Sequence, residues 1–187
     1  MSADLYPVFL KLDGLPVVVV GGGEVAASKL AALLAAGARV TVIAPQIAAA
    51  IRASSRTVAI VERAFEASDL DGARWVVAAA TPEVNREVAA AATARGLFVN
   101  AVDDTGSASA YLGGVVRRGA VAIAISTHGL APALAGLLRE ALDAVLPADL
   151  DHWVEVATAA RAEWKQAKLP MAERRPLLLR ALERIYA

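Results

Sequence analysis

Cysteine is absent from the 187 residues, which excludes disulfides, iron–sulfur clusters, thiolate zinc sites and a cysteine nucleophile. With only two histidines, the side chains alone cannot build a tight transition-metal site, so we expect no resident metal. Lysine plus arginine equals aspartate plus glutamate at 19 each, and no overall basic field favours nucleic acid as a partner. No apolar run reaches the length of a membrane span, and the first residues lack the cationic and apolar regions of a signal peptide. We therefore expect a cytoplasmic protein that binds neither nucleic acid nor membrane.

The first hundred residues alternate short β-branched runs with alanine-rich stretches typical of helices. The all-valine run at 17–20 is typical of a strand that is buried on both faces. We expect strands at 17–20, 40–43, 58–61, 75–79 and 97–100, helices at 26–36, 47–52 and 82–95, and a short strand or hairpin arm at 6–12. This alternation predicts an α/β fold with a parallel, doubly wound sheet.

The character of the sequence changes after Asp104. Residues 120–126 predict a strand that has no obvious place in the first sheet, so pairing with a second subunit is one interpretation. Pro132 begins a helix that we expect to continue to residue 145, and Pro147 follows its end. The tail to Ala187 predicts two amphipathic helices divided near residues 169–170.

A glycine-rich motif joins the first expected strand to the first helix. It consists of Gly21, Gly22, Gly23, Glu24, Val25 and Ala26 and fits the pattern G-x-G-x-x-G/A. Gly21 permits a tight turn, Gly23 lets the backbone approach a pyrophosphate, and Ala26 lets the helix pack closely on the strand. The free N–H groups of the first helical turn would then face the phosphates. The motif predicts a dinucleotide site, and the alternative is a glycine-rich turn with no ligand.

The acidic residue that usually holds the adenine ribose is missing at the end of the second strand, where Ala44, Pro45 and Gln46 stand instead. The backbone at Pro45 or the Gln46 amide could hold the ribose, and spacing alone leaves the choice between NAD and NADP open. Thr81 and Asn85 follow the fourth strand, where contact with the nicotinamide and a helix-capping or turn role are both possible.

Ordered motifs along almost the whole chain resemble those of precorrin-2 dehydrogenases and of the N-terminal part of siroheme synthases. They are "YPVFLKLDGLPVVVVGGGEVAASKLAALLAAGARVTVIAP", "VVAAATPEVNREVAAAA", "FVNAVDD" and "GAVAIAISTHGLAPALAGLLREALDAVLP". The resemblance implies NAD-dependent oxidation of precorrin-2 to sirohydrochlorin, and some family members also insert ferrous iron. It also implies a Rossmann-like NAD-binding domain at 1–113, a dimerisation segment at 114–145, a helical tetrapyrrole-side domain at 146–187, and a homodimer with intertwined dimerisation segments. We expect no methyltransferase module of the kind that the fused enzymes carry.

The family's key aspartate lies in an Asn-x-x-Asp motif, which here is Asn100 to Asp103. The resemblance makes Asp103 the catalytic residue and places Asn100 on the substrate side. Physical reasoning supports Asp103, because it follows the carboxyl end of a parallel strand and a carboxylate there can take a proton. The alternative is a turn aspartate, although Asp104 is better suited to that role. The family's cofactor contacts correspond to Gly23, Glu24, Val25, Pro45 and Gln46.

We expect further substrate contacts from Ser126, Thr127, His128 and Arg117. His128 stands where the family usually has glycine, and a glycine there suggests either a positive φ or a close approach. His128 either lines the tetrapyrrole pocket or merely replaces a glycine in an adaptable loop. Precorrin-2 is rimmed with carboxylates, so Arg117 is a candidate partner, as are Arg118, Arg139 and Lys165, unless they are only solvated surface charges.

Three functional hypotheses follow: a dehydrogenase, a dehydrogenase that is also a ferrochelatase, and a non-catalytic module that binds NAD or a tetrapyrrole. The intact Asn100/Asp103 motif favours the enzymes over the module. It does not separate the two enzymes, because one aspartate could serve both reactions.

Overall fold

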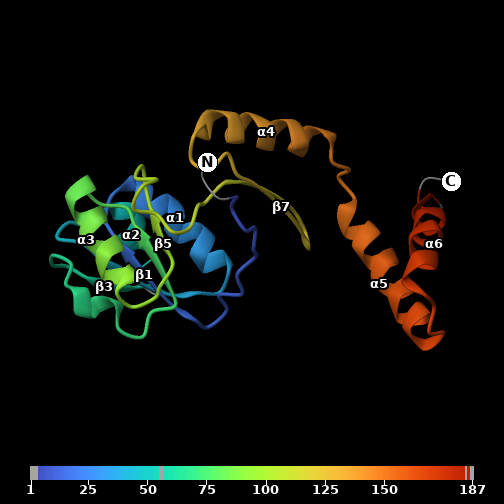
Figure 1. Ribbon diagram of the computed structural model, residues 1–187, viewed down its shortest axis with the longest axis horizontal. Helices are drawn as coiled ribbons and strands as arrows, with labels where there is room; N and C mark the ends of the chain where they lie inside the picture. Colours follow the sequence, from blue (N-terminus) through green and yellow to red (C-terminus); the bar gives the residue numbers. More distant parts are fainter. Residues whose placement is uncertain (1–3, 55–56, 184, 186–187) are drawn as a thin grey trace. The chain divides into compact units, whose positions relative to one another are not determined.

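The computed structural model describes residues 4–54, 57–183 and 185, and it divides the chain into two compact units (Figure 1). The first unit is Met1–Leu112 and the second is Gly113–Ala187. The division lies close to the expected boundary after residue 113. A separate domain from residue 146 onward stays a prediction.

The first unit is a parallel sheet of five strands in the order β3-β2-β1-β4-β5. The strands are β1 (Pro16–Val20), β2 (Arg39–Ile43), β3 (Ala59–Val61), β4 (Trp75–Ala78) and β5 (Val99–Ala101). The helices are α1 (Glu24–Ala35), α2 (Ala49–Ala53), the short 3-10 helix η1 (Ala67–Leu70) and α3 (Pro82–Thr93). The predicted α/β fold is confirmed. The strand order reverses between β1 and β4, the place where doubly wound sheets bind ligands.

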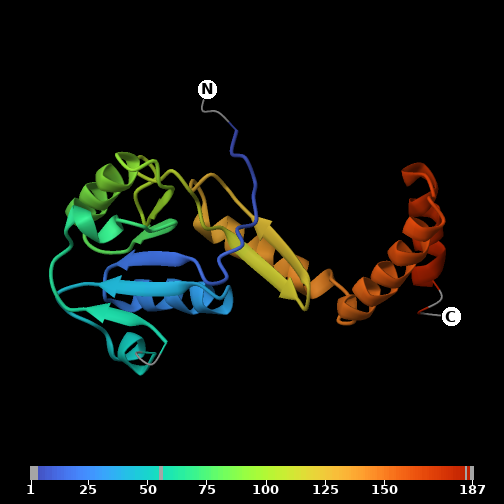
Figure 2. The same cartoon turned by 90° about the horizontal axis from the view of Figure 1, so that it is seen from below.

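Helices lie on both faces of the sheet (Figures 1 and 2), and the valines of β1 alternate between these faces. Val17 and Val19 pack in a core with α1 and α2. Val18 and Val20 pack in a second core with η1 and α3. Because side chains of a strand alternate between faces, both cores require apolar residues from one strand. This burial explains why β1 contains no polar residue.

Helix ends in the first unit follow the expected signals. Gly37 follows α1 with φ +76°, and its N–H donates to the carbonyl of Leu34 at 2.9 Å. Thr81 caps the start of α3, Pro82 occupies its first turn, and Gly96 follows its end with φ +66°.

The strand or hairpin arm expected at 6–12 is wrong, because the structure has no strand there. Asp13 and Gly14 do form the expected turn, in which the N–H of Leu15 donates to the carbonyl of Leu12 at 2.9 Å. The preceding segment cannot pair with β1, since β1 already pairs with β2 and β4.

The second unit contains a two-stranded antiparallel sheet and three helices. The strands are β6 (Gly114–Arg118) and β7 (Val121–Ile125), and the helices are α4 (Pro132–Val145), α5 (Leu150–Gln166) and α6 (Met171–Glu183). The expected strand at 120–126 is confirmed, but its partner β6 was not predicted. Helix α4 has the expected bounds. The tail to Ala187, predicted helical, lies outside the described residues beyond Glu183, apart from Ile185.

Two glycines let the elements of this unit approach one another. A side chain at Gly114 would press on the Ala135 carbonyl in α4, at 2.9 Å from an added Cβ. Gly119, with φ +50°, leaves room in the β6–β7 turn for the carboxylate of Asp151. That carboxylate accepts the Ala120 N–H at 3.2 Å.

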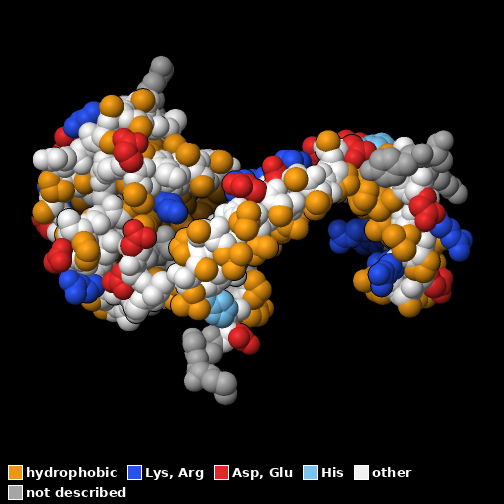
Figure 3. All heavy atoms as spheres, turned by 90° about the horizontal axis from the view of Figure 1, so that it is seen from above, with side chains coloured by type: hydrophobic (Ala, Val, Ile, Leu, Met, Phe, Trp, Pro, Cys, Tyr) orange, Lys and Arg blue, Asp and Glu red, His pale blue; other side chains and the backbone are white. Residues whose placement is uncertain are grey.

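Helix α4 buries one face and leaves apolar side chains on the other (Figure 3). Ala135 is buried, while Leu134, Leu137 and Val145 are exposed. None of the helices described is long and apolar enough to cross a membrane.

Candidate functional site

The three glycines between β1 and α1 have different reasons to be glycine. Gly21 has φ +128°, and an added Cβ would collide with the carbonyl oxygen of Ala79. An added Cβ at Gly22 would collide with the carbonyl oxygen of Gln46. At Gly23 an added Cβ would meet no atom within 4 Å. The first two glycines are therefore required by packing, whereas the third leaves an open approach to the backbone.

The beginning of α1 has the properties of an anion site. Gly23 is the N-cap residue of α1 and has no side chain that could accept a hydrogen bond. The N–H groups of the first turn are therefore not bound by a side-chain oxygen of the N-cap. Glu24 and Val25 are exposed, and Ala26 is fully buried against the sheet. A pyrophosphate at this point would meet free donors and the positive end of the helix dipole.

The loop after β2 packs directly against the glycine loop. The Ala48 N–H donates to the Gly22 carbonyl at 2.7 Å. Pro45 and Gln46 are exposed, so their outer surfaces are free to meet a ribose next to the phosphate position. This placement agrees with the expected cofactor contacts, which stay predictions.

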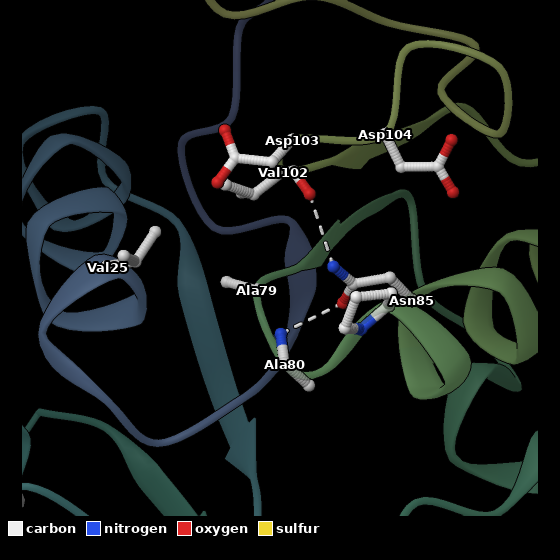
Figure 4. Close-up of a pocket in the computed structure, with 8 residues that line it drawn as sticks. Val25, Ala79, Ala80, Asn85, Val102, Asp103 and Asp104 are labelled. Carbon is white, nitrogen blue, oxygen red and sulfur yellow. Dashed lines mark hydrogen bonds between the residues drawn. The ribbon is translucent and has the colours of Figure 1, made fainter.

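A hollow lies at the carboxyl end of the strands on both sides of the strand-order reversal (Figure 4). It is lined by Val25, Ala79, Ala80, Pro82, Asn85, Val102, Asp103 and Asp104. The structure therefore brings the start of α1 together with the segments that follow β4 and β5, as the motifs predict.

Asn85 and Thr81 both have structural roles at this hollow. The buried Asn85 amide accepts the Ala80 N–H at 2.9 Å and donates to the Val102 carbonyl at 3.2 Å, as Figure 4 shows. It thereby ties the segment after β4 to the segment after β5. Thr81 accepts the Val84 N–H at 3.5 Å as the N-cap of α3. Nicotinamide contact by Thr81 stays a prediction.

The neighbouring carboxylates of Asp103 and Asp104 have different environments. Asp104 accepts the Ser107 N–H at 3.1 Å, and hydrogen bonds from Ser107 hold the pKa of its carboxyl below the ordinary value. Asp103 is exposed, has φ +58°, and makes no hydrogen bond through its carboxylate to any residue that the structure describes. The two carboxylates point apart in Figure 4. Asp104 is therefore the turn aspartate, and the catalytic role of Asp103 stays a prediction.

Asn100 also has a structural partner. It is buried in β5, with its Nδ2 donating to the carbonyl of Ala110 at 3.0 Å. This bond holds the returning chain against the last strand. A contact between Asn100 and substrate stays a prediction.

The other expected substrate residues lie in the second unit. Ser126 accepts the His128 N–H at 3.2 Å, and Thr127 accepts the Ala131 N–H at 3.3 Å, so both hydroxyls stabilise the loop before α4. His128 is exposed with φ +56°, which confirms the positive φ expected at this position. Arg117 is an exposed residue of β6. Their roles toward substrate stay predictions.

Known proteins have similar sequences or the same fold. Residues 8–114 match the model of a family described as putative NAD(P)-binding. The chain is 42% identical over 183 residues to siroheme synthase 1 of Aeromonas salmonicida (strain A449), covering 96% of this chain and 39% of the relative. It is 39% identical over 175 residues to siroheme synthase 1 of Serratia proteamaculans (strain 568), covering 92% and 37%. The chain thus spans about two fifths of the length of these relatives.

A solved structure described as SirC, precorrin-2 dehydrogenase, has the same fold, with a TM-score of 0.70. It is 23% identical in sequence, and the match covers 94% of this chain and 88% of that chain. The resemblance that the motifs predicted is confirmed. The glycine loop and the open start of α1 agree with the family match over residues 8–114. The chain belongs to the family described as putative NAD(P)-binding.

Proposed function

We propose that this protein oxidises precorrin-2 to sirohydrochlorin with NAD+ in the cytoplasm. The free Asp103 carboxylate beside the start of α1 carries the proposal. It puts a proton acceptor at the hollow where the strand order reverses, next to the backbone that suits a pyrophosphate. The printed names of the relatives and of the SirC structure support the choice of substrate.

The residues present fit a dinucleotide. The N–H groups from Gly23 to Val25 would hold the pyrophosphate, and Pro45 and Gln46 would hold the adenine ribose. Thr81 would lie toward the nicotinamide. When bound, NAD+ supplies the acceptor for a hydride.

Asp103 would take the proton that accompanies this oxidation. Converting precorrin-2 to sirohydrochlorin removes two electrons and two hydrogens, one as hydride and one as a proton. The proton bonds to a carboxylate oxygen of Asp103, whose backbone is held at the end of β5. General-base assistance of this kind contributes about 10²–10⁴-fold to rate.

The second unit would contribute substrate contacts and a dimer interface. The exposed Arg117 guanidinium suits a peripheral carboxylate of the substrate, and Asn100 with Ser126, Thr127 and His128 would complete this side. Among the described residues, β6 and β7 pair only with each other, so each has an edge open to a second copy. The exposed leucines of α4 would be covered in such a homodimer.

Ferrous iron insertion is a second candidate activity. The relatives are named siroheme synthases, and siroheme contains iron. No group of three or more His, Asp or Glu in residues 4–54, 57–183 and 185 could hold a metal ion. The ion would therefore be held by the macrocycle and carboxylates, and the Asp103 carboxylate would take the two pyrrole protons in turn, releasing the first to water before it takes the second.

Anaerobic spectroscopy tests both activities. Purified protein is mixed with precorrin-2 and NAD+, the absorbance is followed, and ferrous ion is then added. We expect NAD-dependent formation of sirohydrochlorin. Asp103→Asn should retain NAD binding and lose about 10²–10⁴-fold in rate, since asparagine adopts positive φ readily but cannot take the proton. Asp104→Asn is the matched control and should keep most of the activity. Full turnover by Asp103→Asn would overturn the base assignment.

A further inference from the structure

The end of β3 places one carboxylate beside the end of β2. Ile43 pairs with Val61 in the parallel register, and the N–H of Ala44 donates to the Val61 carbonyl at 3.2 Å. Glu62 is the next residue after Val61. Its backbone therefore lies beside the strand end where an acidic residue usually holds the adenine ribose.

Arg52 of α2 is bound to this carboxylate by two parallel hydrogen bonds. Both guanidinium nitrogens donate to the two oxygens of Glu62, each at 2.7 Å. About half of each side chain is exposed, at 50% for Arg52 and 47% for Glu62. The hydrogen bond lowers the pKa of Glu62 and raises the pKa of Arg52, so both groups are charged at neutral pH. A two-point contact of this kind uses the face that an arginine would present to a phosphate.

A second arginine near the end of β3, Arg63, is also paired. Arg63 follows Glu62 and donates through both terminal nitrogens to the Asp69 carboxylate. Arg39 is the first residue of β2, and Arg74 directly precedes β4. Both therefore lie at the amino ends of the strands, away from Glu62. Within the described part of the first unit, the arginines near the end of β2 thus have carboxylate partners.

We propose that the Arg52–Glu62 pair makes this site select NAD over NADP, an inference that rests on the proposed cofactor site and sharpens it. The 2′-phosphate of NADP would meet the Glu62 carboxylate, which repels it. The same carboxylate occupies Arg52, the group best suited to bind that phosphate. The acid of the neighbouring strand thus takes over the repulsion of a 2′-phosphate, while the hydrogen bonds to the ribose are left to Pro45 and Gln46.

Binding of NAD and of NADP is measured by titration on the whole protein and on three variants. Glu62→Gln removes the negative charge and frees Arg52, so NADP should bind roughly tenfold more tightly, as expected for one charge-assisted hydrogen bond. Affinity for NAD should change by less than about twofold, since NAD has no phosphate there. The double variant Glu62→Gln/Arg52→Gln should lose the gain. Asp71→Asn, which removes the carboxylate partner of Arg95 at 2.9 Å just before β4, is the matched control and should leave both affinities unchanged.

The outcomes separate the inference from the proposed function. If the wild type binds NAD while Glu62→Gln leaves NADP affinity unchanged, the inference fails and the cofactor site stands. If the double variant keeps the gain, Arg52 is not the phosphate partner and the inference also fails. A wild type that binds neither dinucleotide overturns the proposed cofactor site and the inference together.

Discussion

Replacing Gly23 by aspartate should separate stability from cofactor binding. Gly23 has φ −88° and ψ −172°, which any residue adopts, and an added Cβ meets nothing within 4 Å. Aspartate is among the best N-cap residues and also interacts favourably with the helix dipole. We expect the free energy of unfolding to stay the same or to rise by up to about 1 kcal/mol.

Binding of NAD should fall sharply in the same variant. The new carboxylate would stand beside a pyrophosphate bound at the start of α1. For a separation of about 5 Å and an effective dielectric constant of about 20, each pair of like charges costs about 3 kcal/mol. Even if salt screening halves this value, the two charges of the pyrophosphate together give about 3 kcal/mol, or more than about 100-fold in affinity.

Thermal unfolding and NAD titration of Gly23→Asp and Gly23→Asn test this reasoning. Asparagine has the same size and N-cap ability but no charge, so its effect on affinity should be much smaller. Wild-type NAD affinity in Gly23→Asp would show that the glycine loop does not hold the phosphates. A large loss of stability would instead show that position 23 is not the open N-cap that the structure has.

Three further substitutions test the packing and the backbone. Gly21→Ala should destabilise the protein by about 2–4 kcal/mol in urea unfolding. The residue has φ +128°, and the new methyl group would collide with the Ala79 carbonyl. A destabilisation below about 1 kcal/mol would contradict this collision. The hydrogen bond from Arg63 lowers the pKa of Asp69 in the folded protein. The pair therefore stabilises the folded protein fully at pH values above the unfolded pKa of about 4, and this stabilisation is lost as pH falls through the lowered pKa. Asp69→Asn should therefore be less stable than the wild type at pH 7 and should lose less between about pH 5 and pH 2, and parallel pH curves would refute this. His128→Gly should raise the free energy of unfolding by up to about 1 kcal/mol, since φ +56° strains a histidine; equal stability would show that the strain is negligible.

The first half of the fold was predictable because its signals are local. The valines of β1 and the glycine after α1 set the bounds of both elements to within two residues. The bounds of helix α4 agree with the prediction, since Pro132 begins the helix and Pro147 lies just past its end. Such residues restrict the backbone wherever they occur, and no knowledge of distant contacts is needed.

The errors concern strands, whose existence depends on a partner. Residues 6–12 have the composition of a strand, but β1 has no free edge for them. Strand β6 begins with glycine and ends with two arginines, a weak strand signal, and it forms because β7 follows after a tight turn at Gly119. The sequence therefore showed β7 without showing what pairs with it.

The candidate site also combines features that local sequence determines with features that depend on distant contacts. The glycine loop and the turn role of Asp104 were predictable from short patterns, and the positive φ of His128 from the glycine that the resembling family usually has there. The position of Glu62 was not, because it lies next to the end of β2 only through the register of two strands. The hydrogen bond from Asn85 to the Val102 carbonyl also joins residues that are 17 positions apart, a separation that no local pattern covers.

The hydrogen bonds of the Val102 backbone explain how Asp103 can keep its carboxylate free. The N–H of Val102 donates to the Ala78 carbonyl at 2.9 Å, and the Val102 carbonyl accepts from Asn85 at 3.2 Å. Both polar groups of the preceding backbone are thus held by the β4 side of the sheet. A left-handed backbone costs a residue such as Asp103 about 1–2 kcal/mol. Here the hydrogen bonds of the Val102 backbone stabilise this conformation, and the Asp103 side chain does not contribute. Asp104, by contrast, uses its carboxylate to hold the turn. Because the sheet and Asn85 position the backbone, the Asp103 carboxylate can stay without a hydrogen bond to the described residues, as the proposed role as proton acceptor requires.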